Sequence, residues 1–191
     1  MLDFLFFGCK ISFMGGVFLN NENKTEIKTL IKDFSLPRYN DIPNVGLYLE
    51  QVVKYISEYL SPLGSFSLTG SMVSNYVKKG LVENPVKKQY DRKQIASLIF
   101  IAVAKNVLSM DDILLLFKMQ EKTYEPKRAY DYFCNELENI LGCVFGLKDL
   151  ETIGSDSNDT KTMLRNTIIA VAYKVYLDKY LAVLHSEEDN L

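Results

Sequence analysis

The stretch "MVSNYVKKGLVENPVKKQYDRKQI", from Met72 to Ile95, combines a short helical pattern with a dense group of positive charges. It holds six Lys/Arg against two carboxylates, a net charge of +4 in a 191-residue chain whose net charge is −2. The rest of the chain therefore carries −6. Because a negatively charged protein attracts polyanions only through a local patch, this stretch is the first candidate for a nucleic-acid-binding surface.

The first part of the stretch predicts a short amphipathic helix from Gly70 to Lys79. Thr69 or Ser67 is placed to cap its start, and Gly80 is placed as the residue after its end, with Leu81 folding back. Residues three and four apart share a helix face. One face is therefore apolar and predicted to be buried (Met72, Val73, Tyr76, Val77), and the other is small, polar and basic (Ser71, Ser74, Asn75, Lys78).

The second part predicts a turn and a wing. Asn84-Pro85 is a turn signal, and residues 86–90 have the composition of a short extended piece. Asp91 and Gln94 then have the spacing of a capping box. The strongly apolar segment "RKQIASLIFIAVAKNVL" follows, and we expect it to be a buried helix.

The flanking segments are also predicted to be helical. "VGLYLEQVVKYISEYL" precedes the basic stretch with helical spacing, and Ser109 is placed to cap "MDDILLLFKMQ" after it. Pro126 suits a first helical turn, and "MLRNTIIAVAYKVYLDKYLAVL" predicts a long apolar helix for a bundle or a subunit interface. Near the N-terminus, "NNENKTE" is predicted to be a linker and "EIKTLIKDFSL" a short helix.

The pattern assigns candidate contacts if a helix-turn-helix places one helix in the major groove. Ser and Asn are short enough to reach base edges, and lysine and arginine neutralise phosphates. Tyr90 would fix the wing or touch the DNA backbone. The alternative is a solvated helix face followed by a charged turn. The predicted base contacts are Ser71, Ser74 and Asn75, and the predicted phosphate contacts are Lys78, Lys79, Lys87, Lys88 and Arg92.

Three pieces of the sequence, "NYVKKGLV", "NPVKKQYDRKQI" and "LSMDDILLLF", together resemble the MerR-type winged-helix DNA-binding domain. The resemblance covers about 50 residues and implies a helix-turn-helix with a short β wing. Two departures affect the predicted contacts. Ser74-Asn75-Tyr76 stands where that family usually has Arg-Tyr-Tyr, and a Lys-Lys-Gln wing stands where it is rich in arginine.

A longer segment is similar to an uncharacterised bacterial family catalogued as domain of unknown function eighteen thirty-six. Its blocks are "LPRYNDIPNVGLYLEQVVKYI", "LTGSMVSNYVKKGLVENPVKKQY" and "IFIAVAKNVLSMDDI". We expect this similarity to span Leu36 to Phe117 and to extend to the C-terminus. It implies a MerR-like DNA-binding module, and the family carries no established activity.

Other chemistry is weakly represented. The three cysteines form no CxxC pair, His185 is the single histidine, and no phosphate-binding glycine loop is present. We therefore predict no catalytic residues, no metal site and no cofactor. Cys134 and Cys143 are expected to pack as small hydrophobic residues. Six tyrosines line an aromatic effector pocket in one interpretation and pack in a core or dimer interface in the other (Tyr124, Tyr130, Tyr132, Tyr173, Tyr176, Tyr180).

The apolar N-terminus "MLDFLFFGCKISFMGGVFL" lacks the basic start and cleavage site of an export signal, and it is too interrupted to span a bilayer. We expect a loosely ordered segment over residues 1–24, no membrane association and a cytoplasmic location. The charged residues of the long C-terminal helix also argue against a membrane span.

These patterns predict an all-α fold. A MerR-like winged helix-turn-helix domain with a short β wing spans residues 25–120, and a helical dimerisation or sensing module spans residues 121–191. The predicted function is that of a transcriptional regulator that binds double-stranded DNA as a homodimer, with a small-molecule effector as an open addition. The alternative is a non-enzymatic protein-interaction module that has the MerR-like fold and does not bind DNA.

Overall fold

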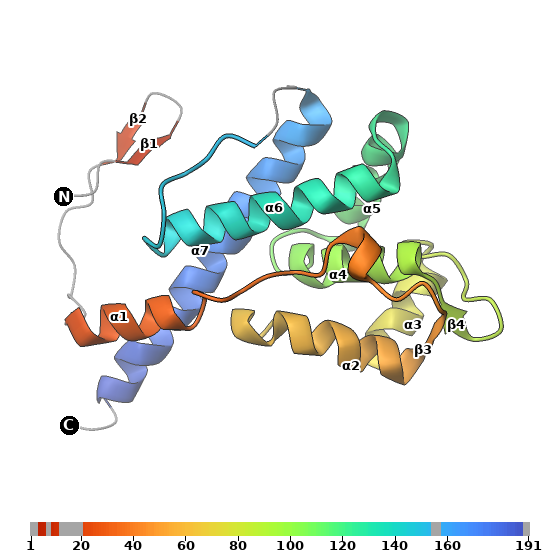
Figure 1. Ribbon diagram of the computed structural model, residues 1–191, viewed down its shortest axis with the longest axis horizontal. Helices are drawn as coiled ribbons and strands as arrows, with labels where there is room; N and C mark the ends of the chain where they lie inside the picture. Colours follow the sequence, from red (N-terminus) through yellow and green to blue (C-terminus); the bar gives the residue numbers. More distant parts are fainter. Residues whose placement is uncertain (1–3, 7–8, 12–20, 154–157, 189–191) are drawn as a thin grey trace.

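The computed structural model describes residues 4–6, 9–11, 21–153 and 158–188, and within these ranges helices dominate (Figure 1). The described β-structure amounts to two antiparallel pairs of short strands. One pair joins β1 (Phe4–Phe6) to β2 (Cys9–Ile11), inside the N-terminal segment predicted to be loose. Most of that predicted segment lies outside the described residues. The prediction of a mainly helical protein is confirmed.

The first helix differs from the sequence prediction. Helix α1 spans Asn21–Thr29, so it covers the polar stretch predicted to be a linker and ends well before Pro37. Its apolar residue Ile27 is buried, as is Ile31 in the turn that follows. Burial of these two side chains stabilises a helix whose other residues are polar, a tertiary effect that composition does not show.

The basic stretch lies in a compact group of elements. Helix α2 (Leu49–Leu60) is followed by a short 3-10 turn and then by α3 (Gly70–Lys78). Strands β3 (Leu47–Tyr48) and β4 (Gln89–Tyr90) pair antiparallel, and α4 (Arg92–Ala104) begins directly after β4. The pairing of β3 with β4 therefore places the start of α2 beside the start of α4.

Three longer helices complete the chain: α5 (Met110–Thr123), α6 (Pro126–Val144) and α7 (Asp159–Glu188). Ser109 caps α5 and Pro126 opens α6, as predicted. Helix α7 packs chiefly against α6 and crosses behind it in Figure 1. The sequence "GSDS" before α7 lies outside the described residues, and Asn158 accepts a hydrogen bond from the Lys161 amide at the start of α7.

Helix α4 is the centre of the hydrophobic core. Its residues from Leu98 to Ala104 are all buried, and the core continues without a break from α2 and α3 into α6 and α7. The Phe100 ring packs edge-on against Phe117 of α5 and Phe133 of α6 at centroid distances of 5.4 and 5.3 Å. The predicted boundary at residue 120 falls inside α5, so the two predicted domains share this core.

An ion pair fastens the segment before α2 to α6. Arg38 donates from both terminal nitrogens to the two carboxylate oxygens of Glu138, at 2.7 and 2.6 Å. The Leu36 amide donates to the same carboxylate at 2.9 Å. Hydrogen bonding to Glu138 raises the pKa of Arg38 against the opposing effect of burial. Residues 100 positions apart are thus joined by a two-pronged, charge-assisted contact.

A second carboxylate lies fully inside the protein. Glu136 of α6 is buried, and Nε of Arg165 on α7 lies 3.0 Å from its Oε1 atom. Burial raises the pKa of the Glu136 carboxyl, and the positive charges of Arg165 and Lys161 oppose that effect. The neighbouring Cys134 is also buried, which confirms its prediction as a packed residue and raises the pKa of its thiol to about 12.

Among the described helices, none combines the length and apolar character needed to cross a membrane.

Candidate nucleic-acid interface

Helix α3 begins and ends as its sequence predicts. The Thr69 hydroxyl accepts a hydrogen bond from the Met72 amide at 3.2 Å, which selects Thr69 over Ser67 as the cap. At the other end Gly80 has φ +74°, and the Gly80 and Leu81 amides donate to the carbonyls of Val77 and Tyr76. This is a Schellman ending, in which the left-handed residue is most easily a glycine.

The two faces of α3 are confirmed by burial. Val73 and Tyr76 are buried, and Met72 and Val77 are half-buried against the core. The opposite face is exposed along its length (Ser71, Ser74, Asn75, Lys78). The Ser74 hydroxyl donates to the Gly70 carbonyl at 2.9 Å, which leaves its oxygen lone pairs directed outward as acceptors. The exposed face of α3 therefore carries small polar side chains with a lysine at its end.

The hairpin after α3 turns at two lysines. Val86 and Gln89 exchange backbone hydrogen bonds of 3.1 and 2.9 Å, so Lys87 and Lys88 are the two central residues of a tight turn. Both have positive φ, at 51° and 65°. The extended conformation predicted for residues 86–90 is therefore wrong at these two positions and holds for Gln89 and Tyr90 in β4.

This turn is one that normally selects other residues. Two-residue hairpins with positive φ at both centres strongly favour Asn-Gly or Asp-Gly. A side chain with a Cβ in the left-handed region costs roughly 1 kcal/mol or more per residue. Lys87 and Lys88 occupy these positions and are both exposed. Two ammonium groups thus project from the tip of a hairpin whose backbone they do not favour.

Two predicted contact residues also have structural roles. Tyr90 is only 5% exposed, so its ring anchors β4 in the core, which agrees with the predicted fixing of the wing. The Arg92 guanidinium donates to the carbonyls of Ile42 and Asn40 at 2.8 and 3.2 Å and lies over the Tyr39 ring. These bonds use Nε and one terminal nitrogen of the guanidinium and hold the segment before β3; the predicted phosphate contact of Arg92 stays a prediction.

Four cations of the stretch remain at the surface without a carboxylate partner among the residues that the structure describes: Lys78, Lys79, Lys87 and Lys88. Lys93, in contrast, pairs with Glu83 at 2.9 Å. In Figure 1 the end of α3 and the hairpin before β4 lie toward the same end of the molecule. The exposed face of α3 and the hairpin tip, defined by Ser71, Ser74, Asn75 and these four lysines, are called the basic surface below.

One element of this region was missed from sequence. Strand β3 is two residues long, and its pairing with β4 was not predicted. Tyr48 of β3 is exposed beside Gln89, and Val86 at the hairpin is exposed as well. The alternation in "VGLY" is too short to signal a strand without its partner. An aromatic and an aliphatic side chain therefore flank the basic surface in addition to the predicted residues.

The six tyrosines separate into two groups. Tyr124, Tyr130 and Tyr132 line a cleft of about 860 Å³ beside α4 and α5. Tyr176 packs against Phe145 and Tyr180 on α7, at centroid distances of 5.4 and 5.9 Å. Tyr173 is exposed on the same helix. Within the described ranges, no three His, Cys, Asp or Glu side chains come together in a metal-binding group.

Comparison with protein families gives a match to the family described as Domain of unknown function (DUF1836), over residues 37–133. This segment is half of the chain. The chain belongs to the DUF1836 family. The match begins one residue after the predicted start, passes Phe117 and ends at Phe133 rather than extending to the C-terminus. The family segment contains the whole basic surface, α4 and α5. No curated protein and no solved structure matches the chain.

Proposed function

We propose that this DUF1836 protein binds double-stranded DNA through the basic surface. In this proposal α2 and α3 act as a helix-turn-helix of the MerR-like type, and the hairpin of residues 86–89, which leads into β4, acts as its wing. The observation that carries the proposal is the pair of exposed lysines in left-handed conformation at the hairpin tip. Backbone strain that is kept at a surface position calls for a function of the residues that cause it.

The chemistry of the tip supports a polyanionic partner. Lys87 and Lys88 are adjacent, exposed and unpaired within the described chain, so a phosphate backbone can approach both ammonium groups. A wing that contacts phosphates fixes the orientation of the protein without reading sequence. Lys78 and Lys79, at the end of α3, add two further charges on the side of the helix that faces solvent.

The exposed face of α3 supports contacts to base edges. Asn75 can form a paired donor-acceptor contact with adenine, and serine hydroxyls contact several bases. No long side chain covers Ser71, Ser74 and Asn75, which are all exposed. A nine-residue helix with small polar groups on its outer face fits the major groove. Helix α3 is therefore assigned as the recognition helix.

We propose further that the protein acts as a cytoplasmic regulator of transcription in the form of a homodimer. Helix α7 has 30 residues, which corresponds to a length of ~45 Å. One stripe of this helix is exposed and largely apolar: Met163 (48%), Ala170, Tyr173 (39%), Leu177 (52%) and Leu181 (48%). These positions lie within a quarter of the helix circumference, and a second copy of α7 would cover them. A dimer places two recognition helices on two half-sites.

The experiment that tests the proposal selects purified protein against random duplex DNA and then measures affinity for the winning sequence at several salt concentrations. We expect a palindromic motif and a steep fall in affinity with salt, because bound phosphates release counterions. Sequence-blind retention, or none, would overturn the proposal. A stable complex with an acidic protein in the same preparation would then assign the basic surface to protein binding.

The variant that isolates the wing is Lys87→Ala combined with Lys88→Ala. Affinity should fall by a similar factor on all sequences, and the slope of log affinity against log salt should become shallower by about 1 to 2. The matched control is Lys28→Ala with Lys32→Ala, two exposed lysines near α1 and outside the basic surface. An unchanged salt slope in the wing variant would remove the wing from the interface.

A further inference from the structure

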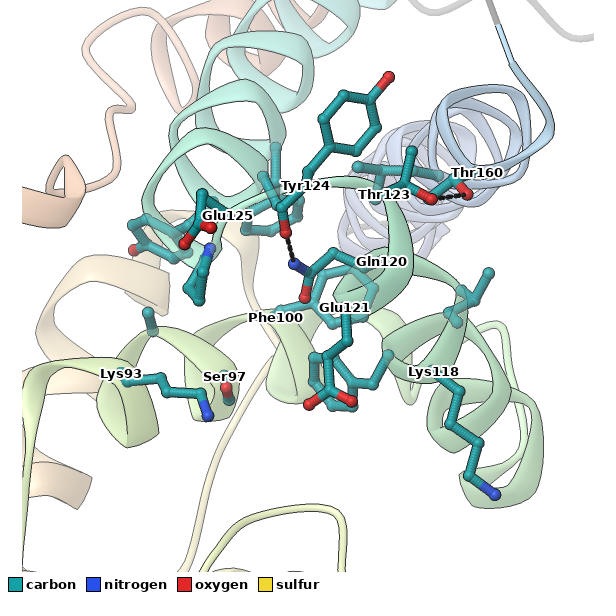
Figure 2. Close-up of a pocket in the computed structure, with 18 of the residues that line it drawn as sticks. Lys93, Ser97, Phe100, Lys118, Gln120, Glu121, Thr123, Tyr124, Glu125 and Thr160 are labelled. Atoms are coloured by element: carbon teal, nitrogen blue, oxygen red, sulfur yellow. Dashed lines mark hydrogen bonds between the residues drawn. The ribbon is translucent and has the colours of Figure 1, made fainter.

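The cleft of about 860 Å³ lies where the family segment meets the C-terminal helices (Figure 2). Helix α4 contributes one wall with Lys93 and Ser97, and α5 contributes the facing wall with Lys118 and Glu121. The beginning of α6 and the first turn of α7 close the far end, and residues 80–83 after α3 form another part of the lining. The volume falls within the range of small-molecule sites.

The interior of the cleft is aromatic. Phe100, Phe117 and Phe133 form a connected set of edge-on rings behind it. Tyr124 and Tyr132 are half-buried and also line the cleft. Ring faces and edges that are held in place in this way favour a flat aromatic ligand, which gains both apolar burial and ring contacts.

The rim carries more positive than negative charge, and two of its cations lie over aromatic rings. The Arg128 guanidinium lies 5.1 Å from the centre of the Tyr124 ring, and the Lys161 ammonium lies 5.1 Å from the centre of the Tyr132 ring. The charged lining residues give a net charge of +2: five cations (Lys93, Lys118, Lys122, Arg128, Lys161) against three carboxylates (Glu83, Glu121, Glu125). An anionic group on an aromatic ligand that packs near these rings would lie close to their two cations.

Hydrogen bonds hold the end of α5 and join it to the start of α7 at one end of the cleft. The Gln120 amide donates to the Tyr124 carbonyl at 2.5 Å, and the hydroxyls of Thr123 and Thr160 are 3.1 Å apart, which links α5 to α7 (Figure 2). Asn158 donates to the Tyr124 hydroxyl from the segment before α7. This end of the cleft is therefore preformed, so a ligand would lose little affinity to ordering it.

We propose that this cleft binds a small, flat aromatic molecule that carries a negative charge. The volume sets its size, the phenylalanine and tyrosine rings set its aromatic character, and the excess of lysine and arginine sets its charge. The proposal concerns the cleft itself and stands whether or not the protein binds DNA. The predicted effector pocket is thereby placed on Tyr124, Tyr130 and Tyr132, and not on the tyrosines of α7.

The position of the cleft gives the ligand a means of regulation. Residues 80–83 join α3 to the hairpin and also line the cleft. A ligand that contacts these residues and α5 together would fix the recognition helix relative to the C-terminal helices. This regulatory step rests on the proposed DNA-binding function, because it acts through the affinity of the basic surface.

The test uses two probes of equal size and opposite charge, 1-naphthoate and 1-naphthylmethylammonium, titrated calorimetrically into the full chain. We expect 1-naphthoate to bind with one site per chain, and at least about tenfold more tightly than the cation. Equal or tighter binding of the ammonium probe would overturn the assignment of charge. No heat with either probe, at concentrations up to the millimolar range, would overturn the site.

Two variants place the bound probe. Ser97→Trp fills the cleft from α4 and should reduce affinity for 1-naphthoate by about tenfold or more, whereas Ser57→Trp on α2 is the matched control outside the cleft. Lys118→Glu with Lys122→Glu reverses two exposed rim charges without altering the core. It should weaken binding by about fivefold, and Lys28→Glu with Lys32→Glu repeats the same spacing elsewhere.

Equal effects of the paired variants would show that the probe binds outside the cleft and would overturn the proposal. Hydrogen exchange gives a readout that needs no DNA: bound 1-naphthoate should slow exchange of the amides of residues 80–83 and 94–97, and unchanged rates there would contradict the site. The affinity for the selected DNA, measured with and without the probe, then tests regulation separately. Failure to bind any DNA would sink the proposed function and leave the calorimetric result standing.

Discussion

The α3–hairpin region exposes its charged side chains to solvent, whereas the α6–α7 pair buries one. At the hairpin, Lys87 and Lys88 are fully displayed, and the cost lies in the backbone conformation that displays them. Between α6 and α7, Glu136 is hidden, and the cost lies in its removal from water, offset by Arg165. A binding partner can contact the strained lysines at the surface. The buried carboxylate is instead paired with Arg165 inside the protein, where a partner does not reach it. This difference points to the hairpin as the place where the protein meets another molecule.

The largest effect is expected from the exposed stripe of α7. If two chains dimerise through this stripe, the affinity of the basic surface for DNA depends on α7. Leu177→Asp with Leu181→Asp should convert a dimer to a monomer in sedimentation velocity and reduce affinity for a palindromic site by about a hundredfold or more. The core should be unaffected, since both side chains are about half exposed. A variant that stays dimeric would show that α7 is not the subunit interface, and Lys174→Asp on the same helix is the control for added negative charge.

The next largest effect is expected at the ion pair that joins the segment before α2 to α6. Glu138→Ala removes the acceptor of both Arg38 bonds and of the Leu36 amide, which leaves partly buried donors unsatisfied. We expect a loss of about 2–3 kcal/mol in the free energy of unfolding, measured by urea denaturation. Glu58→Ala, which breaks an exposed pair with Lys54, should cost less than about 0.5 kcal/mol. If the two variants lost similar amounts of unfolding free energy, the Arg38–Glu138 pair would not be a structural link.

The two regions also differ in how far the sequence predicts them. Around α3 the signals are local and agree with one another: the Thr69 cap, the Gly80 ending, and the reciprocal Asp91–Gln94 bonds of 2.8 Å are each specified within a few residues. The polar face of α3 follows from spacing alone, and it is the part of the candidate site that was correctly placed from sequence.

What the sequence could not show depends on distant partners. Arg92 was assigned to phosphates because it is basic, and its hydrogen bonds to the carbonyl groups of Asn40 and Ile42, 50 or more positions away, were not predicted. Helix α1 was placed too late in the chain, because burial of Ile27 in a tertiary contact stabilises a helix in the polar stretch before it. The left-handed turn at Lys87 was missed for the opposite reason: local rules favour other residues there, so a pattern-based prediction assigns an ordinary strand.

The hairpin provides a direct test of strain kept for charge. Lys87→Asn with Lys88→Gly supplies the residues that this turn favours, and should raise the free energy of unfolding by about 1–2 kcal/mol. The same change removes two charges and should weaken DNA binding while flattening its salt dependence. The comparison with Lys87→Ala and Lys88→Ala separates the two effects, because alanine removes the charge and keeps the strain. A stabilised variant with unaltered DNA affinity would leave the strained lysines without the function proposed for them.

The smallest expected effect concerns the interior counterpart, Glu136. Its pKa is raised by burial, so the folded protein holds this proton to a higher pH than the unfolded chain does. The stability that the neutral carboxyl contributes is complete below the unfolded pKa, near roughly 4.3, and is lost as pH rises through the higher folded value. Glu136→Gln keeps the shape and never ionises. Its advantage over the natural protein should be close to zero near pH 4 and should grow as the pH rises to 8.

Thermal unfolding of both proteins across that pH range measures the difference, with Glu26→Gln at an exposed position of α1 as the control. If Glu136→Gln were instead the less stable protein at pH 8, the Arg165 pair would outweigh the cost of burial. The interior charge would then be a net stabilising contact, and only the hairpin would carry an unfavourable feature. The left-handed Lys87–Lys88 turn would then be the unfavourable feature of the two regions compared, and it lies on the surface that we propose binds DNA.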